Sequence, residues 1–179
     1  MRRLIYSLLI VAVSVTGFVS CKKTNPQYAP YISFSVFLRN PVFSHDSIVG
    51  CQDTISLTYD ESSGFYLADT LLVKDTVLFL AGFGSRGNDL VSVSVSIPAD
   101  AFKTEYSVTD DIRSKLTDDS TPEEGKLSFV SGYNYVMFPM KYVALQSGVY
   151  KFVFNVVSDS DYSPLSVTVV QPVKEAAAQ

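Results

Sequence analysis

Residues 91–97 read VSVSVSI, and this alternation predicts the fold class of the whole chain. Successive side chains of a β-strand point to opposite faces, so the serines would share one face and the apolar residues the other. A strand of this kind packs one face on a core and leaves the other in water. The apolar face here would consist of Val91, Val93, Val95 and Ile97.

The same alternation recurs along the chain. In residues 31–39 one face would consist of Ile32, Phe34, Val36 and Leu38, and in residues 53–59 of Ile55, Leu57 and Tyr59. Two later strands would bury Tyr150, Phe152, Phe154 and Val156, and Leu165, Val167 and Val169. Residues 76–83, TVLFLAGF, are apolar at nearly every position, which predicts a central strand covered on both faces.

Turn-forming residues separate these segments. Residues 60–64, 82–89 and 158–164 are rich in Gly, Ser and Asp and predict hairpin loops. Pro139 cannot donate a main-chain hydrogen bond, so it predicts an edge strand or a bulge. Residues 110–116 predict a short helix that Thr109 caps, with Ile112 and Leu116 on one face, crossing from sheet to sheet.

Together these segments predict a single antiparallel β-sandwich of about eight to nine strands over residues 30–173, with a flexible tail at 174–179. Residues 145–159, LQSGVYKFVFNVVSD, resemble the corner before the penultimate strand of immunoglobulin-like modules, through Leu145, Gly148 and Tyr150. The resemblance implies an immunoglobulin-like sandwich in which the Tyr150 hydroxyl bonds back to main chain. The antibody-type Cys–Trp–Cys core is absent, because the chain has no tryptophan.

Residues 1–21, MRRLIYSLLIVAVSVTGFVSC, differ in composition from the rest. Two arginines precede an apolar run, and small Ser20 stands before Cys21. This stretch resembles the lipobox of bacterial lipoproteins, although Phe18 and Val19 replace its usual leucine and small residue. The resemblance implies a signal helix at 1–20, removed as a signal peptide, and lipidation of Cys21. Ordinary secretion or an uncleaved anchor are the alternatives, but a membrane span needs roughly 20 mainly apolar residues.

Residues 21–29 would then be the lipidated cysteine and a short polar tether. Because each buried methylene contributes about 0.8 kcal/mol, two or more acyl chains hold a protein firmly on a membrane. The chain resembles the small lipoproteins of Bacteroidetes-type bacteria, of which the surface-exported ones carry acidic residues after the cysteine. Lys22 and Lys23 stand there instead. The resemblance therefore implies the outer membrane, with its periplasmic face favoured over the cell surface.

Charge and cysteine content exclude other classes of protein. Without Arg2 and Arg3 the chain has 12 basic and 18 acidic residues, a net charge of −6. An acidic domain with no basic stripe is poorly suited to bind nucleic acid. Once Cys21 is lipidated, Cys51 has no cysteine to pair with. We expect Cys51 to be a small buried side chain, with a reactive thiol or an intermolecular cross-link as alternatives.

No set of residues predicts an enzyme. The single histidine, His45, stands between Ser44 and Asp46, but catalytic triads are assembled from separate segments, so we expect a loop histidine. Acidic pairs at 110–111, 118–119 and 123–124, and the aspartates at 159 and 161, are expected to be solvated. Calcium on one of these loops is the alternative, although the EF-hand spacing is missing. No cofactor or structural metal is expected.

Three tyrosines are the candidate interaction surface: Tyr133, Tyr135 and Tyr162, which lie in or beside predicted loops. Exposed tyrosines can stack on sugars or anchor a protein partner. We therefore expect a non-catalytic binding or scaffolding module, held on the outer membrane by lipid, with a protein or glycan partner. The alternatives are a glycan-binding accessory lipoprotein of a polysaccharide uptake system and a fimbria-like subunit whose fold is completed by a neighbour's strand.

Overall fold

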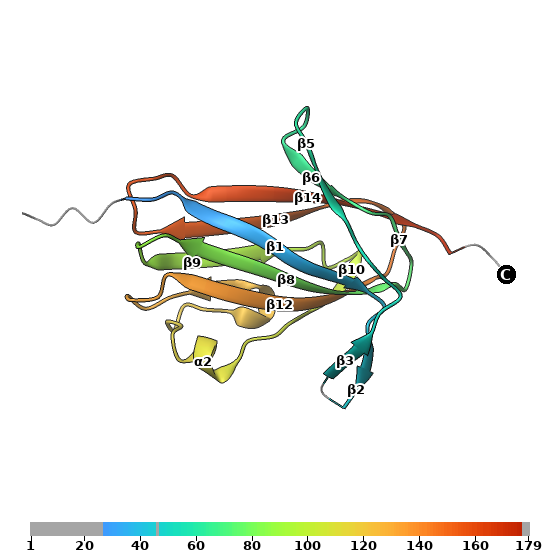
Figure 1. Cartoon of the computed structure of the whole chain (residues 1–179), viewed down its shortest axis with the longest axis horizontal. Helices are drawn as coiled ribbons and strands as arrows, with labels where there is room; N and C mark the ends of the chain where they lie inside the picture. Colours follow the sequence, from blue (N-terminus) through green and yellow to red (C-terminus); the bar gives the residue numbers. More distant parts are fainter. Residues whose placement is uncertain (1–26, 46, 177–179) are drawn as a thin grey trace, which may run out of the picture.

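The computed structural model describes residues 27–45 and 47–176, which form two packed β-sheets (Figure 1). The first sheet contains β1 (Pro30–Arg39), β4 (Asp53–Thr54), β8 (Thr76–Ser85), β10 (Phe102–Tyr106) and β12 (Tyr135–Ala144). The second contains β5 (Leu57–Asp60), β6 (Phe65–Ala68), β7 (Leu71–Leu72), β9 (Leu90–Ser96), β11 (Lys126–Ser128), β13 (Gly148–Ser158) and β14 (Leu165–Lys174). A separate hairpin consists of β2 (Val42–Ser44) and β3 (Ser47–Gly50).

The strand order confirms the predicted all-β sandwich. The first sheet runs β10-β12-β8-β1-β4 and the second β11-β9-β13-β14-β6-β5, with β7 beside β14. Most neighbours are antiparallel, but β14 pairs parallel with β6 and with β7. The described residues contain 14 strands, more than the eight or nine expected, because the segment after β1 is divided into several very short strands. Lys174, assigned to the flexible tail, belongs to β14.

The core lies between the sheets and is centred on the ring of Phe79 in β8. Its centroid lies 4.1 Å from that of Phe37 and 5.7 Å from that of Phe34, both in β1. It lies 5.4 Å from that of Phe154 in β13, which belongs to the other sheet. The alternation in β13 is confirmed, because Phe154 and its neighbours on the same face, Phe152 and Val156, are buried. These rings therefore join the two sheets.

Two of the predicted alternations are wrong in part, because β-bulges interrupt the strands. In β1 the pairing with β8 shifts between Phe34 and Val36, so Phe37 takes the next buried position and Leu38 turns to the outer face. In β9 the pairing with β13 shifts beside Val91. Leu90 is therefore buried while Val91, predicted to face the core, is exposed. An extra residue in one strand moves the side chains on one side of the bulge to the opposite face from the one that alternation predicts.

The predicted strand at 53–59 is also divided. It ends as β4 at Thr54, and the chain then crosses to the second sheet and resumes as β5. Ile55 and Leu57 face the interior as predicted, but Tyr59 is exposed and packs on Tyr66 instead. The burial of these three side chains therefore follows from the crossing between the sheets and not from a continuous strand.

The hairpin loop predicted at residues 82–89 is wrong in part. Residues 86–89 do form a loop, but β8 extends through Ser85, and β8 and β9 belong to different sheets. Gly82 and Gly84 are strand residues. A Cβ at Gly82 would lie 2.6 Å from Ser33 Oγ, and one at Gly84 would lie 2.6 Å from the Tyr31 ring. Glycine is needed there because side chains of neighbouring strands lie across β8. The hairpins at 60–64 and 158–164 are confirmed.

β8 is central, as predicted, but Leu78 and Leu80 on its outer face are only half-buried. β12 is not an edge strand, and its register with β8 runs unbroken through Pro139. The Pro139 carbonyl accepts a hydrogen bond from Ser107 N at 3.0 Å, just after β10 ends. The N–H and C=O of one residue point to the same side of an antiparallel strand. The N–H that Pro139 lacks would therefore point beyond the end of β10, where no strand residue pairs with it.

The short helix is confirmed as α2 (Asp110–Arg113). The Thr109 hydroxyl accepts a hydrogen bond from Ile112 N at 3.3 Å, and Ile112 is buried. A 3₁₀ turn, η1 (Pro122–Glu124), follows it, and together they carry the chain from β10 in the first sheet to β11 in the second.

Removing the central ring should destabilise the domain strongly. We expect Phe79→Ala to lower the free energy of unfolding by about 3–5 kcal/mol, because the cavity forms where the two sheets meet. Val149→Ala, at a side chain that is 72% exposed, should change it by less than about 0.5 kcal/mol. Urea unfolding of both variants followed by circular dichroism would measure this, and equal effects would contradict the packing described.

Alkaline pH should also destabilise the fold through Tyr142. Its phenol is fully buried and donates to Gln171 Oε1 at 3.3 Å, and burial raises its pKa well above the usual value near 10. The folded protein keeps this proton at a pH where the unfolded chain loses it, so stability falls as pH rises above about 10. The free energy of unfolding, measured across this range, should fall less steeply with pH for Tyr142→Phe than for the natural chain. An unchanged slope would contradict this effect of the buried phenol.

Candidate functional site

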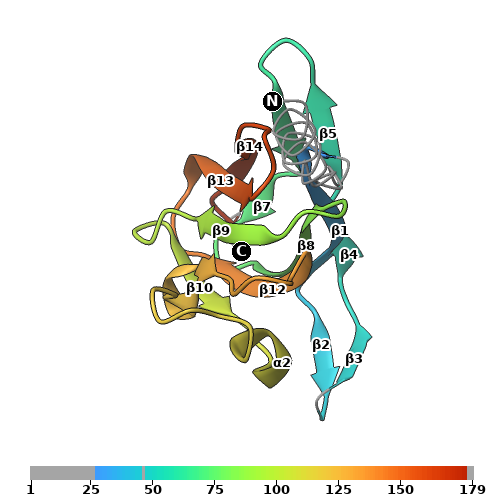
Figure 2. The ribbon, with the colours of Figure 1, turned by 90° about the vertical axis from the view of Figure 1, so that its left-hand side faces the viewer.

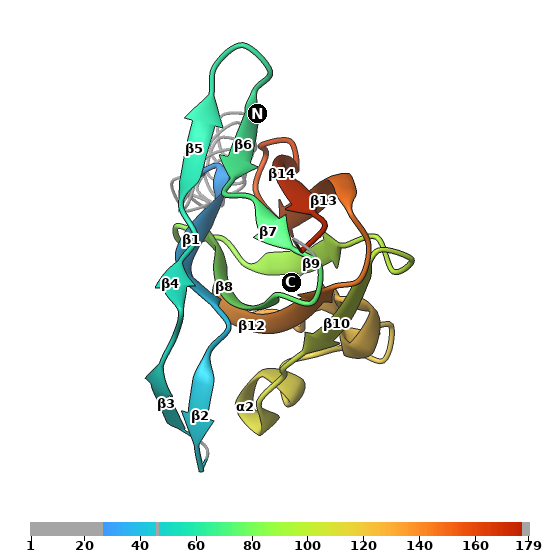
Figure 3. The same ribbon diagram turned by 90° about the vertical axis from the view of Figure 1, so that its right-hand side faces the viewer.

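The segment between β1 and β8 departs from the regular sandwich. After β1 the chain forms the β2–β3 hairpin, returns to the end of β1 as β4, crosses to the second sheet and forms the β5–β6 hairpin. Figures 2 and 3 show these pieces along one side of the sandwich, with the two hairpins projecting in opposite directions. This segment therefore supplies surfaces that the core itself does not need.

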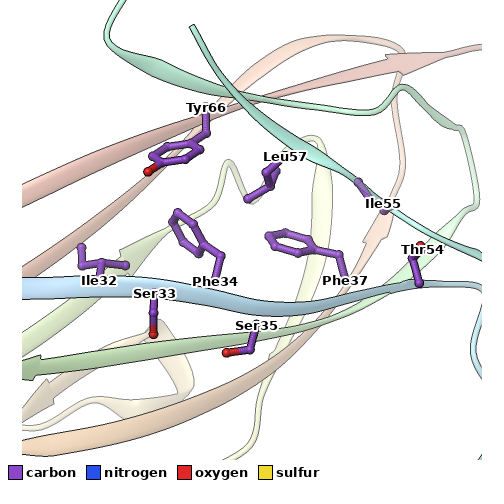
Figure 4. Close-up of a pocket in the computed structure, with 9 residues that line it drawn as sticks. All are labelled: Ile32, Ser33, Phe34, Ser35, Phe37, Thr54, Ile55, Leu57 and Tyr66. Carbon is purple, nitrogen blue, oxygen red and sulfur yellow. The ribbon is translucent and has the colours of Figure 1, made fainter. Parts of the chain in front are cut away.

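A cleft of about 550 Å³ lies between β1 and this crossing segment. Figure 4 shows Phe34 and Phe37 rising from β1 toward Tyr66, Leu57 and Ile55 on the opposite wall. The remaining lining residues are Ile32, Ser33, Ser35 and Thr54, of which the two serines point away from the aromatic rings. The cleft is thus an extension of the core that opens at the side of the sandwich.

Aromatic contacts hold the two walls of the cleft together. The rings of Phe34 and Tyr66 meet edge to face, with centroids 5.5 Å apart, and Tyr59 packs on Tyr66 at 5.1 Å. The bulge in β1 is needed for this geometry, because it puts Phe34 and Phe37 on the same side although they are three residues apart. Strict alternation puts Phe37 on the outer face, which is why sequence reasoning missed this site.

The cleft has hydroxyls as its polar side-chain groups, on Ser33, Ser35, Thr54 and Tyr66. Its nine lining residues include no carboxylate, histidine, cysteine or basic side chain. Such groups most often carry out general acid–base chemistry and activate hydroxyl nucleophiles. Charged ligands would lose hydration here without gaining a partner. The walls favour an apolar group, with hydroxyls at the margin for hydrogen bonds.

A polar cluster lies at the end of β1, beyond the lining of the cleft. Arg39 Nε lies 3.3 Å from Asp53 and 3.8 Å from Asp75, and Arg39 Nη2 donates to the Thr70 carbonyl at 3.1 Å. Asn40 Nδ2 donates to Asp75 Oδ1 at 2.9 Å. These groups come from β1, β4 and the turn before β8, so they fix the place where the segment leaves and rejoins the sandwich.

The three candidate tyrosines have different environments. Tyr133 is partly buried and stacks on Phe129 at 5.4 Å, so it belongs to the edge of the core. Tyr135 lies over Gly82 on the outer face of the first sheet, where partial burial and then the neighbouring Tyr31 raise its pKa. Tyr162 is exposed between β13 and β14. Among the described residues, no ring contact joins these three tyrosines.

Cys51 is exposed, so the prediction of a buried side chain is wrong. It follows β3 at the base of the β2–β3 hairpin, which has no second layer to bury it. The hairpin also exposes Val42, Phe43, Ile48 and Val49. His45 is exposed at its tip, as expected of a loop histidine. Asp46 and Cys21 lie outside the described residues.

The acidic residues of the loops make local contacts. Asp159 Oδ1 accepts from Asp89 N at 2.7 Å, and Glu124 pairs with Lys126 at 3.0 Å. Within residues 27–45 and 47–176, no three acidic, histidine or cysteine side chains gather so that they could hold a metal ion. In the same part of the chain, no helix is both long and apolar enough to cross a membrane.

Comparison of the sequence with protein-family models and with curated proteins gave no match. Among solved structures, the chain is similar to part of a family 123 glycoside hydrolase from Clostridium perfringens, described in a structural analysis of glycolipid glycan hydrolysis. The TM-score is 0.37 and the identity 12%, over 60% of this chain. The match spans only 22% of that enzyme's chain.

The contact between the cleft walls can be measured by a double-mutant cycle. We expect Phe34→Leu and Tyr66→Leu to show a coupling of about 0.5–1.5 kcal/mol in the free energy of unfolding, as edge-to-face pairs do. Phe34→Leu combined with Tyr162→Leu, on a distant loop, should be additive within about 0.5 kcal/mol. Additivity in the first pair would contradict the contact between the two walls of the cleft.

Proposed function

We propose that this protein is a lipid-anchored, non-catalytic binding module of the outer membrane, and that the cleft beside β1 is its binding site. The observation that supports binding is the cleft itself, which is open to solvent, is lined mainly by aromatic and aliphatic side chains, and has no carboxylate, histidine, cysteine or basic group among its lining residues. The resemblance of residues 1–21 to a lipoprotein leader supports the anchor, and Lys22 and Lys23 favour the periplasmic face.

The topology supports an immunoglobulin-like domain as the scaffold. The strands β10-β12-β8-β1 form one layer and β9-β13-β14 the other, and β8 and β9 follow each other in different layers. Tyr150 OH donates to the Ser147 carbonyl at 3.0 Å, the bond that the corner resemblance implies. A Cβ at Gly148 would lie 2.8 Å from that hydroxyl, so glycine makes room for it.

The anchor would set the orientation of the domain. Gln27 and Tyr28 are bound to the loops at one end, through Asn88 and the main chain of Asp161. Five residues lie between Cys21 and Gln27, and the six peptide steps reach at most about 20 Å. The loops at that end would therefore face the membrane. Figure 1 shows both projecting hairpins away from this end, where a partner could reach them and the cleft.

Exchange of one cysteine should remove the anchor. We expect Cys21→Ala to abolish incorporation of labelled palmitate and to release the protein from washed membranes. Cys51→Ala is the matched control and should keep both properties, because its thiol lies on the folded domain. Labelling of Cys21→Ala at the level of the natural chain would contradict the anchor.

A small apolar probe tests the cleft. The chain has no tryptophan, so Tyr66→Trp places a single fluorophore in the cleft and Val149→Trp places one at an exposed position of β13, outside the cleft. We expect 1-hexanol, added to the full chain in phosphatidylcholine vesicles, to shift the emission of Tyr66→Trp and not that of Val149→Trp. Equal responses, or none, would contradict a binding cleft.

A further inference from the structure

The strand that forms the floor of the cleft has an unpaired edge. β1 pairs along its length with β8, but on its other side it meets only β4, through Leu38 with Thr54 and Arg39 with Asp53. One further hydrogen bond, from Ile55 N to the Phe37 carbonyl at 3.0 Å, completes this contact. Among the described residues, no strand pairs with this side of β1 from Pro30 to Val36.

This edge has little of the protection that exposed edges usually carry. Natural sheets block such edges with lysine, proline or a covering loop. Pro30 stands at the first residue of β1, but residues 31–38, YISFSVFL, contain no charged residue and no further proline. The bulge near Ser35 is the one irregularity, and it opens the cleft by turning Phe34 and Phe37 to the same side.

The position beside β1 is half filled by the chain itself. β4 occupies it for two residues, antiparallel to β1, and the chain then leaves at Ile55 toward the second sheet. An incoming strand in line with β4 would find main-chain donors and acceptors along β1. Every second side chain of that strand would point between the sheets, where the walls are Phe34, Leu57 and Tyr66.

We propose that the occupant of the cleft is an extended segment of a partner polypeptide, added antiparallel to the free edge of β1, with uncharged apolar residues at alternate positions. This inference rests on the proposed function of the cleft as a binding site. A strand satisfies the unpaired main chain and the apolar walls together, which is the basis of recognition by β-strand addition. An acyl chain or another apolar molecule would fill the walls but leave the edge to water.

The choice of residues in the partner follows from the walls. The cleft offers no counter-ion, so a charged side chain entering it would stay unpaired. The hydroxyls of Ser33 and Ser35 point to the outer side of the sheet, where polar residues of the added strand would lie beside them. The charged groups Arg39 and Asp53 mark the end at which β4 already occupies the edge.

Three synthetic peptides separate strand addition from apolar packing. The probe is KTVTVTVK, acetylated and amidated at its ends. The second peptide has the same sequence and is made in two versions. One carries N-methyl groups on the threonine amides and the other on the valine amides. Each version removes the main-chain donors that face one side of the strand and keeps all side chains. The third, KVVVTTTK, keeps the composition and loses the alternation. Each is titrated into full-length Tyr66→Trp in phosphatidylcholine vesicles, with Val149→Trp as the control reporter.

We expect KTVTVTVK to shift the emission of Tyr66→Trp at concentrations at least tenfold lower than the better-blocked N-methyl version and KVVVTTTK. In the Tyr66→Trp background, Leu57→Asp should abolish the shift, whereas Thr58→Asp, exposed on the same strand, should leave it unchanged. Circular dichroism of both variants should give the spectrum of the folded Tyr66→Trp protein. If both N-methyl peptides bind as well as the probe, the inference is overturned.

The outcome with 1-hexanol distinguishes this inference from the function on which it rests. Binding of 1-hexanol without binding of KTVTVTVK would overturn strand addition and leave the apolar binding site intact. Binding of neither would overturn both. If the peptide binds and Leu57→Asp does not weaken its binding, the edge is used without the cleft. That result also contradicts the proposal.

Discussion

The register shift in β1 is the constraint on which the site depends. A strand in strict alternation would send Phe34 to the core and Phe37 to the outer face. The extra residue between Phe34 and Val36 instead keeps both rings on the inner side, against Phe79 and Tyr66. The outer face gains Leu38 in exchange. One local irregularity therefore widens the core at the edge of the sheet and produces the cleft.

The parts of the chain on either side of this strand in the topology have different structural roles. The residues from β8 to β14 form the two layers and the ring cluster that stabilises them. The segment from β2 to β7 contributes fewer residues to the core. It pairs with the sandwich through β4, β6 and β7, and ion pairs of Arg39 with Asp53 and Asp75 hold it at the end of β1. Such a division lets a stable scaffold carry a variable surface, as binding domains commonly do.

Much of the fold follows from local patterns that have a direct physical cause. The alternation in β13, the Thr109 cap and the bond of Tyr150 to Ser147 are all consequences of nearby residues, and each is confirmed. Bulges depend on pairing with distant strands, so the burial of Leu90 and Phe37 could not be predicted from alternation. The same holds for Gly82 and Gly84, which look like turn residues but accommodate side chains from the strands beside them. Cys51 is exposed because its hairpin lacks a covering layer, a fact of tertiary structure. The candidate site was missed for this reason too, since its two walls lie on separate segments.

The most direct test of this account is amide hydrogen exchange of residues 31–36 in the full-length, membrane-bound chain. If β1 has one paired and one free edge beside an open cleft, about half of these amides, those facing β8, should be protected, and those facing away should exchange rapidly. Uniform protection across residues 31–36 would show that another part of the chain already covers the edge, and would contradict the account.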